Sequence, residues 1–174
     1  MSPFRPDIVE CWIFRLPEPG RVEVLLIRRS ASRIFPGLWQ CVTGGLEAGE
    51  RVPIAALREV SEEVGFGAAE IEAFYDLDQV SHFYDEGPDA VVAAAIFAIR
   101  VRADAVPRLS HEHDDARWME AAEAARVAVW PSYRQTIERI VGSLADTSLA
   151  GTSAAPWFEL TMDGRRLARA PRGT

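Results

Sequence analysis

The chain has 174 residues, of which 48% are hydrophobic and 26% are charged, and its formal net charge is −7. This length suits one domain with a substantial core, and no apolar run approaches the roughly 20 residues that a membrane-spanning helix needs. The negative charge disfavours long DNA or RNA as a partner, because proteins bind these through many phosphate contacts.

Three strands are predicted ahead of a glycine turn. Residues 8–15 and 22–29 are rich in β-branched and aromatic side chains, and the Pro-Glu-Pro-Gly of residues 17–20 separates them, which is typical of strand, turn and strand. After a Pro-Gly turn, residues 38–43 predict a short strand that leads into Gly44.

Residues 44–66 gather glycines and glutamates in one short stretch. Pro53 fits the first turn of a helix, because its missing N–H would have no partner there. In that helix Glu59, Glu62 and Glu63 share one face, while apolar side chains share another. One face is therefore expected to cover a core and the other to concentrate negative charge.

Three carboxylates so close together repel one another and raise each other's pKa, so this face is stable only with cations nearby. Clustered anionic oxygens are the ligands that hard divalent ions such as Mg²⁺ and Mn²⁺ prefer. The alternative is a solvated, glutamate-rich helix face without a ligand.

The segment after this helix predicts a hairpin. Residues 71–84 alternate loosely between apolar and polar, a turn follows at residues 86–89, and residues 90–101 form a near-continuous apolar run. The second strand is therefore expected to be buried on both faces of the sheet. His82 is either a contact to a base or phosphate or an ordinary surface histidine.

A strand and two helices are predicted next. A polar connection over residues 102–113 leads to a strand at residues 114–120, whose tryptophan we expect to be buried. Residues 121–128 predict a short helix. Residues 132–144 predict a longer one, whose apolar stripe covers a face of the sheet.

The last part of the chain differs in composition. We expect a domain over residues 1–145, a linker or flexible loop over residues 146–156 and a C-terminal segment over residues 157–174. In that segment Asp163-Gly164, between alternating apolar residues, is a hairpin signal. A hairpin packed on the domain, a dimer contact and a frayed tail all stay open, as does the oligomeric state.

The spacing within the glutamate-rich stretch is specific. It runs Gly44, five residues, Glu50, seven residues, Arg58-Glu59-Val60, one residue, Glu62-Glu63, one residue, Gly65-Phe66. With every defined position filled, it resembles the signature of the Nudix hydrolases. The resemblance implies an α/β fold, an α/β/α sandwich with a central mixed sheet, and Mg²⁺-dependent cleavage of a nucleoside diphosphate linked to another group.

The resemblance also implies the metal ligands. Glu59 and Glu63 would ligate Mg²⁺, for which Mn²⁺ is a possible substitute. Glu62 would help in the same cluster, and the carbonyl of Gly44 would complete the shell.

A structural task is implied for the arginine of the signature. Arg58 would pair with a carboxylate such as Glu47 or Glu50 and fix the loop against the helix. That task would be structural rather than chemical.

Short patches outside the signature are similar to one branch of the family, the bacterial dihydroneopterin triphosphate and dATP pyrophosphohydrolases. They are Trp39-Gln40 with residues 42–44, then Glu112-His113 and residues 117–119. The candidates for binding substrate are Arg28, Arg29, Trp39 and Gln40. Each of the two arginines is either a solvated strand-end charge or a fork of donors for phosphate.

The family usually needs one more acid from outside the signature, as a metal ligand or a general base. Glu112 is our candidate, because it lies in a polar connection and in one of the shared patches. Its rivals are Asp76, Asp114 and Asp115. His111 and His113 are expected to contact phosphate or solvent.

The predicted function is Mg²⁺-dependent pyrophosphohydrolysis of a nucleoside triphosphate or pterin triphosphate, giving the monophosphate and pyrophosphate. The partner would be a small nucleotide or related diphosphate, with no long nucleic acid and no membrane. Other substrates of the same chemistry are a nucleotide sugar, a dinucleoside polyphosphate or an oxidised nucleotide. A non-hydrolysing nucleotide sensor on the same fold is a further alternative, disfavoured because every carboxylate of the signature is present.

The cellular location is inferred by default. The start of the chain lacks the apolar segment of a signal peptide. Cys11 and Cys41 are the two cysteines and do not form a CxxC, so buried free thiols are expected. A cytoplasmic location follows from these expectations.

Overall fold

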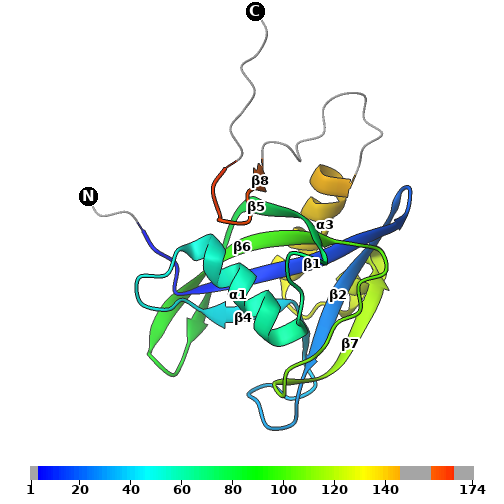
Figure 1. Cartoon of the computed structure of the whole chain (residues 1–174). Coiled ribbons are helices and arrows are strands. Elements are labelled where there is room, and N and C mark those ends of the chain that lie inside the picture. The colour runs from blue at the N-terminus through cyan, green and yellow to red at the C-terminus, as the bar shows by residue number, and fades with distance from the viewer. Residues whose placement is uncertain (1–3, 146–157, 167–174) are drawn as a thin grey trace, which may run out of the picture.

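The computed structural model describes residues 4–145 and 158–166 (Figure 1). The strands are β1 (Ile8–Glu18), β2 (Arg21–Arg29), β3 (Trp39–Gln40), β4 (Val42–Gly45), β5 (Ile71–Asp85), β6 (Ala90–Val101), β7 (His113–Glu120) and β8 (Glu159–Leu160). The helices are α1 (Val52–Val64), α2 (Ala121–Val127) and α3 (Pro131–Ile140), and a π-helical turn at Val141–Ala145 follows α3. None of the helices in these ranges is long and apolar enough to cross a membrane.

The strands form one mixed sheet in the order β3-β2-β1-β6-β5-β8. Strand β1 is central: it runs parallel to β6, while its first half pairs antiparallel with β4 and its second half with β2. β7 pairs with the other edge of β2. The expected mixed sheet is confirmed, and the near-continuous apolar run of β6 fits its place between β1 and β5.

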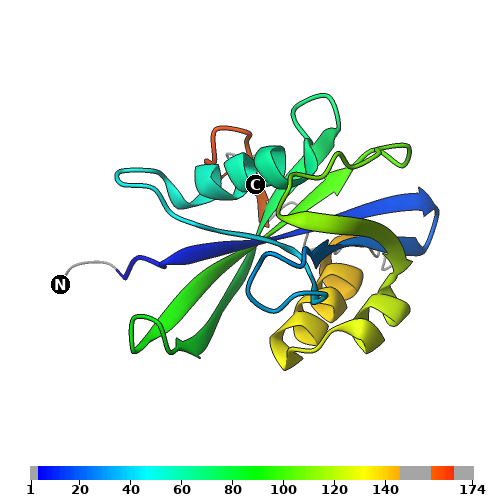
Figure 2. The ribbon, with the colours of Figure 1, turned by 90° about the horizontal axis from the view of Figure 1, so that it is seen from below.

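Helices cover both faces of this sheet, as expected for an α/β/α sandwich. Figure 2 shows α1 on one side and the pair α2 and α3 on the other. Because side chains alternate along a strand, Val9, Cys11 and Ile13 of β1 pack on the α1 side, while Trp12 and Phe14 pack on the α3 side. Each helix layer thus has its own core.

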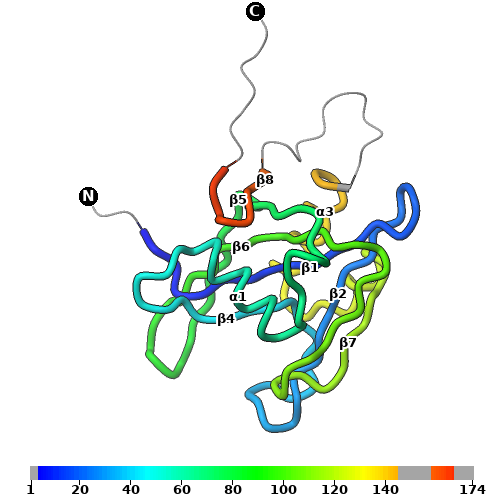
Figure 3. Tube along the Cα trace, viewed as in Figure 1, coloured from blue at the N-terminus to red at the C-terminus, as the bar shows by residue number. Residues whose placement is uncertain are grey.

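The chain end returns to the sheet edge. The Cα trace in Figure 3 places the C-terminal turn beside the start of α1. β8 pairs with β5, and Leu160 forms an antiparallel bridge with Arg166 around the Asp163-Gly164 turn. The expected linker over residues 146–156 lies outside the described residues, so the division of the chain into a domain, a linker and a C-terminal segment stays a prediction.

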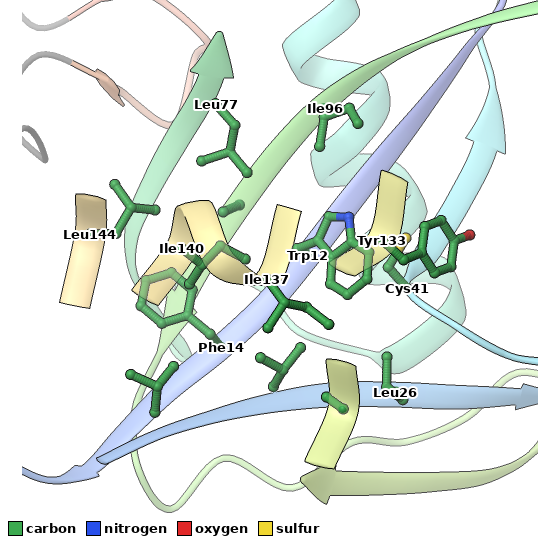
Figure 4. Packing of buried hydrophobic residues seen from close by; sticks show 14 of the residues in the cluster. Trp12, Phe14, Leu26, Cys41, Leu77, Ile96, Tyr133, Ile137, Ile140 and Leu144 are labelled. Atoms are coloured by element: carbon green, nitrogen blue, oxygen red, sulfur yellow. The ribbon is translucent and has the colours of Figure 1, made fainter. Parts of the chain in front are cut away.

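The core on the α3 side is built from large side chains of the sheet and one helix. Figure 4 shows Trp12 and Tyr133 in close packing, with their ring centroids 4.9 Å apart and nearly perpendicular at 89°. Ile137 and Ile140 of α3 fill the space over Phe14. This layer fixes α3 over the sheet, so the polar side chains between α3 and β5 have defined positions.

Several local expectations need correction. The strand expected over residues 38–43 is interrupted at Cys41, because β3 pairs with β2 whereas β4 pairs with β1. Trp118 is half-buried rather than buried, and the guanidinium of Arg15 lies 4.3 Å from its ring centroid. Both cysteines are buried and free, as expected.

Candidate active site

At the centre of the site, the side chain of Glu59 from α1 comes close to the backbone of Gly44. Gly44 is the third residue of the short strand β4, where it pairs with Val9 of β1. A Cβ added at Gly44 would lie 1.9 Å from Cδ of Glu59. Only glycine leaves room for a carboxylate here, so the sequence places the carboxylate of Glu59 directly against the backbone of Gly44.

Arg58 joins the loop before α1 to the helix itself. Its Nε and Nη2 donate to the two carboxylate oxygens of Glu50 at 2.9 and 3.0 Å, and Nη2 also donates to the carbonyl of Gly45 at 2.9 Å. Its Nη1 donates to Oε1 of Glu59 at 2.7 Å. Glu47 takes part through its backbone N–H, which donates to Glu50 at 3.1 Å. The guanidinium and this N–H hold the pKa of Glu50 below its usual value.

The two inner carboxylates are largely removed from water. The side chain of Glu63 is 7% exposed and that of Glu59 is 12% exposed. Burial, followed by the nearby charges of Glu59 and Glu112, raises the pKa of Glu63 to about 8. Burial also raises the pKa of Glu59, against the opposing effect of Arg58. At neutral pH the metal-free protein therefore holds a proton on Glu63.

Glu62 differs from its neighbours. Its side chain is 60% exposed, and the contact described for it is with Nη1 of Arg58 at 3.3 Å. Although it shares a helix face with the two inner carboxylates, it lies at the outer edge of that face. Its position supports Arg58 rather than the inner site.

Glu112 lies near the inner carboxylates, and its rivals are paired elsewhere. Its charge raises the pKa of both Glu59 and Glu63, and its own carboxylate forms an ion pair with Arg33. The three rivals pair with arginines: Asp114 with Arg28 at 2.6 Å, Asp115 with Arg117 at 3.0 Å, and Asp76 with Arg166.

His113 is a site residue whose position the sequence indicated only through its neighbour Glu112. It is 5% exposed, at the start of β7. Its Nδ1 lies 4.0 Å from Oε2 of Glu63, and its Nε2 lies 3.5 Å from the side-chain nitrogen of Gln40. Burial and the charge of Arg29 lower the pKa of His113 to about 4, so the imidazole is neutral at pH 7. The expected contact with solvent is wrong for this buried ring.

The four candidates for substrate binding lie together on β2 and β3. The register pairs Arg28 with Trp39, and Trp39 has the guanidinium groups of Arg28 and Arg117 at 5.7 and 4.9 Å from its ring centroid. Arg29 donates to the side-chain oxygen of Gln40 at 3.4 Å and to the carbonyl of Ile34 at 2.6 Å. Gln40 thus connects this arginine to His113.

A polar groove of about 410 Å³ lies on the α3 side of the sheet. Its lining residues are Gln79, Val80, Ser81, His82, Ser132, Gln135 and Arg139. The hydroxyl of Ser81 donates to Oε1 of Glu10 at 2.9 Å, while Oε2 of Glu10 is buried without a partner. Glu10 pairs in register with Thr43, the residue before Gly44. The groove therefore lies three strands from β4, on the face of the sheet opposite to α1.

Comparison with known proteins identifies the family. The family model described as the NUDIX domain matches residues 8–140. The chain belongs to the NUDIX family.

One similar protein sequence and one similar solved structure place the chain more closely within the family. The dihydroneopterin triphosphate diphosphatase of Escherichia coli (strain K12) is 30% identical over 131 residues, which is 68% of this chain and 82% of that protein. The solved structure of the E. coli dihydroneopterin triphosphate pyrophosphohydrolase has a TM-score of 0.66 at 28% identity, and the superposition covers 79% of this chain and 95% of that one. The resemblance to this branch is confirmed, and the chain is a Nudix hydrolase.

A third relative shares the domain but not its length. An octanoyltransferase of Myxococcus xanthus is 36% identical over 119 residues, or 67% of this chain, yet the match spans 31% of that protein. Its transferase activity is therefore that protein's own and is not carried to this Nudix hydrolase.

The residues of the site fit a hard divalent cation. Within the described ranges, no three His, Cys, Asp or Glu side chains are already gathered as a metal cage, because Glu59 is turned to Arg58 and Glu112 to Arg33. Two features nevertheless suit a cation: Oε2 of Glu63 is buried without a partner among the described residues, and Glu59 lies against the backbone of Gly44. Carboxylate and carbonyl oxygens are the ligands that Mg²⁺ prefers.

Proposed function

We propose that this Nudix hydrolase is a Mg²⁺-dependent pyrophosphohydrolase that cleaves a nucleoside triphosphate or a pterin triphosphate to the monophosphate and pyrophosphate. The observation that carries the proposal is the pair of shielded carboxylates, Glu59 and Glu63, beside the backbone of Gly44. The activity named for the E. coli relative supports the substrate class. A cytoplasmic location stays a prediction.

The chemistry needs positive charge, because the phosphates of an anhydride repel an incoming nucleophile. When bound, Mg²⁺ supplies this charge and lowers the pKa of a bound water. The residues that would hold it are Glu59, Glu63 and the carbonyl of Gly44. Mn²⁺ takes similar oxygen ligands and should substitute.

The surrounding residues have separate tasks in this proposal. Arg58 holds the loop and helix in register through Glu50 and Gly45. Glu112 is the candidate for accepting the proton of the attacking water, since it is partly exposed at 32% and close enough to raise the pKa of Glu63. Glu62 supports Arg58 from outside.

Two parts of the protein are proposed to hold the substrate. Arg28 and Arg29, beside Trp39 and Gln40, offer forked donors for phosphate oxygens. The polar groove between β5 and α3 is proposed to hold the heterocyclic ring, because its side chains offer both donors and acceptors. His82 would contact the ring there.

A panel of substrates tests the proposal. Nucleoside triphosphates, a pterin triphosphate, nucleotide sugars, dinucleoside polyphosphates and oxidised nucleotides would each be incubated with Mg²⁺, and the products separated by chromatography. The expected products are a monophosphate and pyrophosphate from a triphosphate. Turnover confined to a nucleotide sugar or a dinucleoside polyphosphate would overturn the substrate class. Binding of a nucleotide without Mg²⁺-dependent turnover would favour a sensor.

A further inference from the structure

The segment of residues 158–166, which we term the C-terminal clasp, lies outside residues 8–140 that the family model matches. It is nevertheless attached to the sheet: Leu160 and Glu159 pair with Phe74 and Tyr75 of β5. Leu160 is buried in the core on the α1 side, while Phe158 packs against the core on the opposite side. The clasp is therefore anchored in both layers of the protein.

The turn of the clasp rests on the start of α1 (Figure 3). Arg51, the residue immediately before the helix, donates to the carbonyls of Asp163 and Gly164 at 2.5 and 2.9 Å. A Cβ added at Gly164 would lie 2.8 Å from Cβ of Pro53, and the φ of Gly164 is +73°. Backbone conformation and close contact both require glycine at this point.

The start of α1 lacks the usual side-chain cap. Arg51 occupies the N-cap position without a side-chain cap to the helix, and the first turn has no acidic residue. The neighbouring Glu50 is tied to Arg58, and Arg51 is tied to the clasp. The first turn of the helix is thus held by two sets of contacts. The pair of Arg58 and Glu50 lies within the family signature, and the contacts of Arg51 with the clasp involve residues outside it.

The position of this turn decides where the inner carboxylates lie. A helix rises 1.5 Å per residue, so Glu59 follows Arg51 by about 12 Å along one rigid element. The carboxylate of Glu59 fits beside Gly44 only because no side chain lies between them. Since a misplacement of about 1 Å in a site can cost on the order of 100-fold in rate, a small tilt of α1 matters.

We propose that the C-terminal clasp positions the carboxylates of α1, with Arg51 and Gly164 as its positioning residues. The proposal rests on the proposed function, because Glu59 and Glu63 are taken there as the metal ligands. It gives residues beyond the family domain a part in assembling the site.

Arg51→Ala tests the proposal, with Arg165→Ala as its matched control. Both remove one arginine, but the side chain of Arg165 is 75% exposed and pairs with Asp163 inside the clasp. Mn²⁺ affinity would be measured by electron paramagnetic resonance, and backbone exchange of residues 52–58 by hydrogen–deuterium mass spectrometry. We expect Arg51→Ala to weaken Mn²⁺ binding by roughly tenfold, which is less than the rate loss that a misplacement of about 1 Å can cause. The same substitution should speed backbone exchange at the start of the helix. Arg165→Ala should do neither.

Gly164→Ala gives an independent test through shape rather than charge. Its control is Gly20→Ala, because Gly20 also has a positive φ of +80° but no atom within 4 Å of an added Cβ. Gly164→Ala should reproduce the loss of Mn²⁺ affinity, and Gly20→Ala should leave it unchanged. Arg51→Lys, which keeps a charged donor group for the clasp carbonyls but loses the fork of two nitrogens, should recover part of the loss.

The outcomes separate this proposal from the proposed function. Unchanged Mn²⁺ affinity and unchanged helix exchange in both Arg51→Ala and Gly164→Ala would overturn the clasp as a positioning element. A fall in melting temperature without either change would assign it to stability alone. If the wild-type chain binds Mn²⁺ but cleaves no anhydride, the proposed function fails, while Mn²⁺ binding and helix exchange still decide the role of the clasp.

Discussion

Nδ1 of His113 lies 4.0 Å from Oε2 of Glu63, and neither atom has a hydrogen-bond partner among the described residues. The distance is that of an ion pair, but the shifted pKa values leave both groups uncharged at pH 7. The pKa of Glu63 is raised to about 8, and the pKa of His113 is lowered to about 4. In the metal-free protein at pH 7 the two groups are therefore neutral neighbours. Charge returns to Glu63 when a cation replaces its proton.

The first prediction follows from that proton. Binding of Mg²⁺ or Mn²⁺ at pH 7 should release a proton from Glu63, so the apparent metal affinity should rise as the pH approaches about 8. Titration calorimetry in two buffers with different ionisation enthalpies counts the protons released. An observed heat that is independent of the buffer would contradict the assignment of Glu63 as a ligand that is protonated before binding.

The second prediction concerns stability without metal. The folded-state pKa of Glu63 lies above its ordinary value of 4.5, so its contribution to stability is complete below about pH 4.5 and is lost as the pH rises toward about 8. His113 acts in the opposite direction, but only below its ordinary value of 6.5. With chelator present, the wild-type chain should be less stable at pH 8.5 than at pH 6.5, and Glu63→Gln should reduce the difference. Thermal unfolding at the two pH values measures it.

The third prediction compares three glutamates of one helix face. Glu59→Gln and Glu63→Gln should each lower kcat by on the order of 10²- to 10³-fold, the size of loss expected when a group that stabilises the transition state is removed. The fold should survive, because glutamine has nearly the same shape as glutamate and a neutral amide costs less to bury than a carboxylate. Glu62→Gln is the matched control, and its 60% exposure predicts a much smaller loss. Equal losses in all three variants would show that exposure does not separate their roles.

The sequence predicts the helix and its carboxylates well, because both depend on local spacing. A period of 3.6 residues places Glu59 and Glu63 on one face wherever the helix packs. Runs of β-branched and other apolar side chains indicate β1 and β6 just as locally. The contact of Arg51 with Gly164 could not be found like this, since 113 residues separate the two. The break at Cys41 and the half exposure of Trp118 also depend on which strands become neighbours.

The fourth prediction separates Glu112 from its neighbours. Glu112→Gln should lower kcat far more than it raises KM, because the proposed proton transfer occurs only in the transition state. Asp114→Asn should instead raise KM, since Asp114 holds Arg28 at 2.6 Å beside Trp39. Asp115→Asn serves as a further control. Steady-state kinetics of the three variants show which acid accepts the proton. A fall in kcat confined to one aspartate variant would assign the proton transfer to that aspartate instead of Glu112.

The last prediction uses two adjacent glycines that differ in one contact. In Gly44→Ala the new Cβ would lie 1.9 Å from Cδ of Glu59, whereas in Gly45→Ala it would meet no atom within 4 Å. The clash in Gly44→Ala involves the end of a side chain, so Glu59 should rotate away while β4 keeps its pairing with β1. We therefore expect a melting temperature close to that of the wild type in both variants, but a loss of Mn²⁺ affinity and of kcat only in Gly44→Ala. Because the two substitutions are chemically identical and neighbouring, a comparable loss in Gly45→Ala would mean that chain stiffness, rather than the approach of Glu59 to Gly44, controls the site.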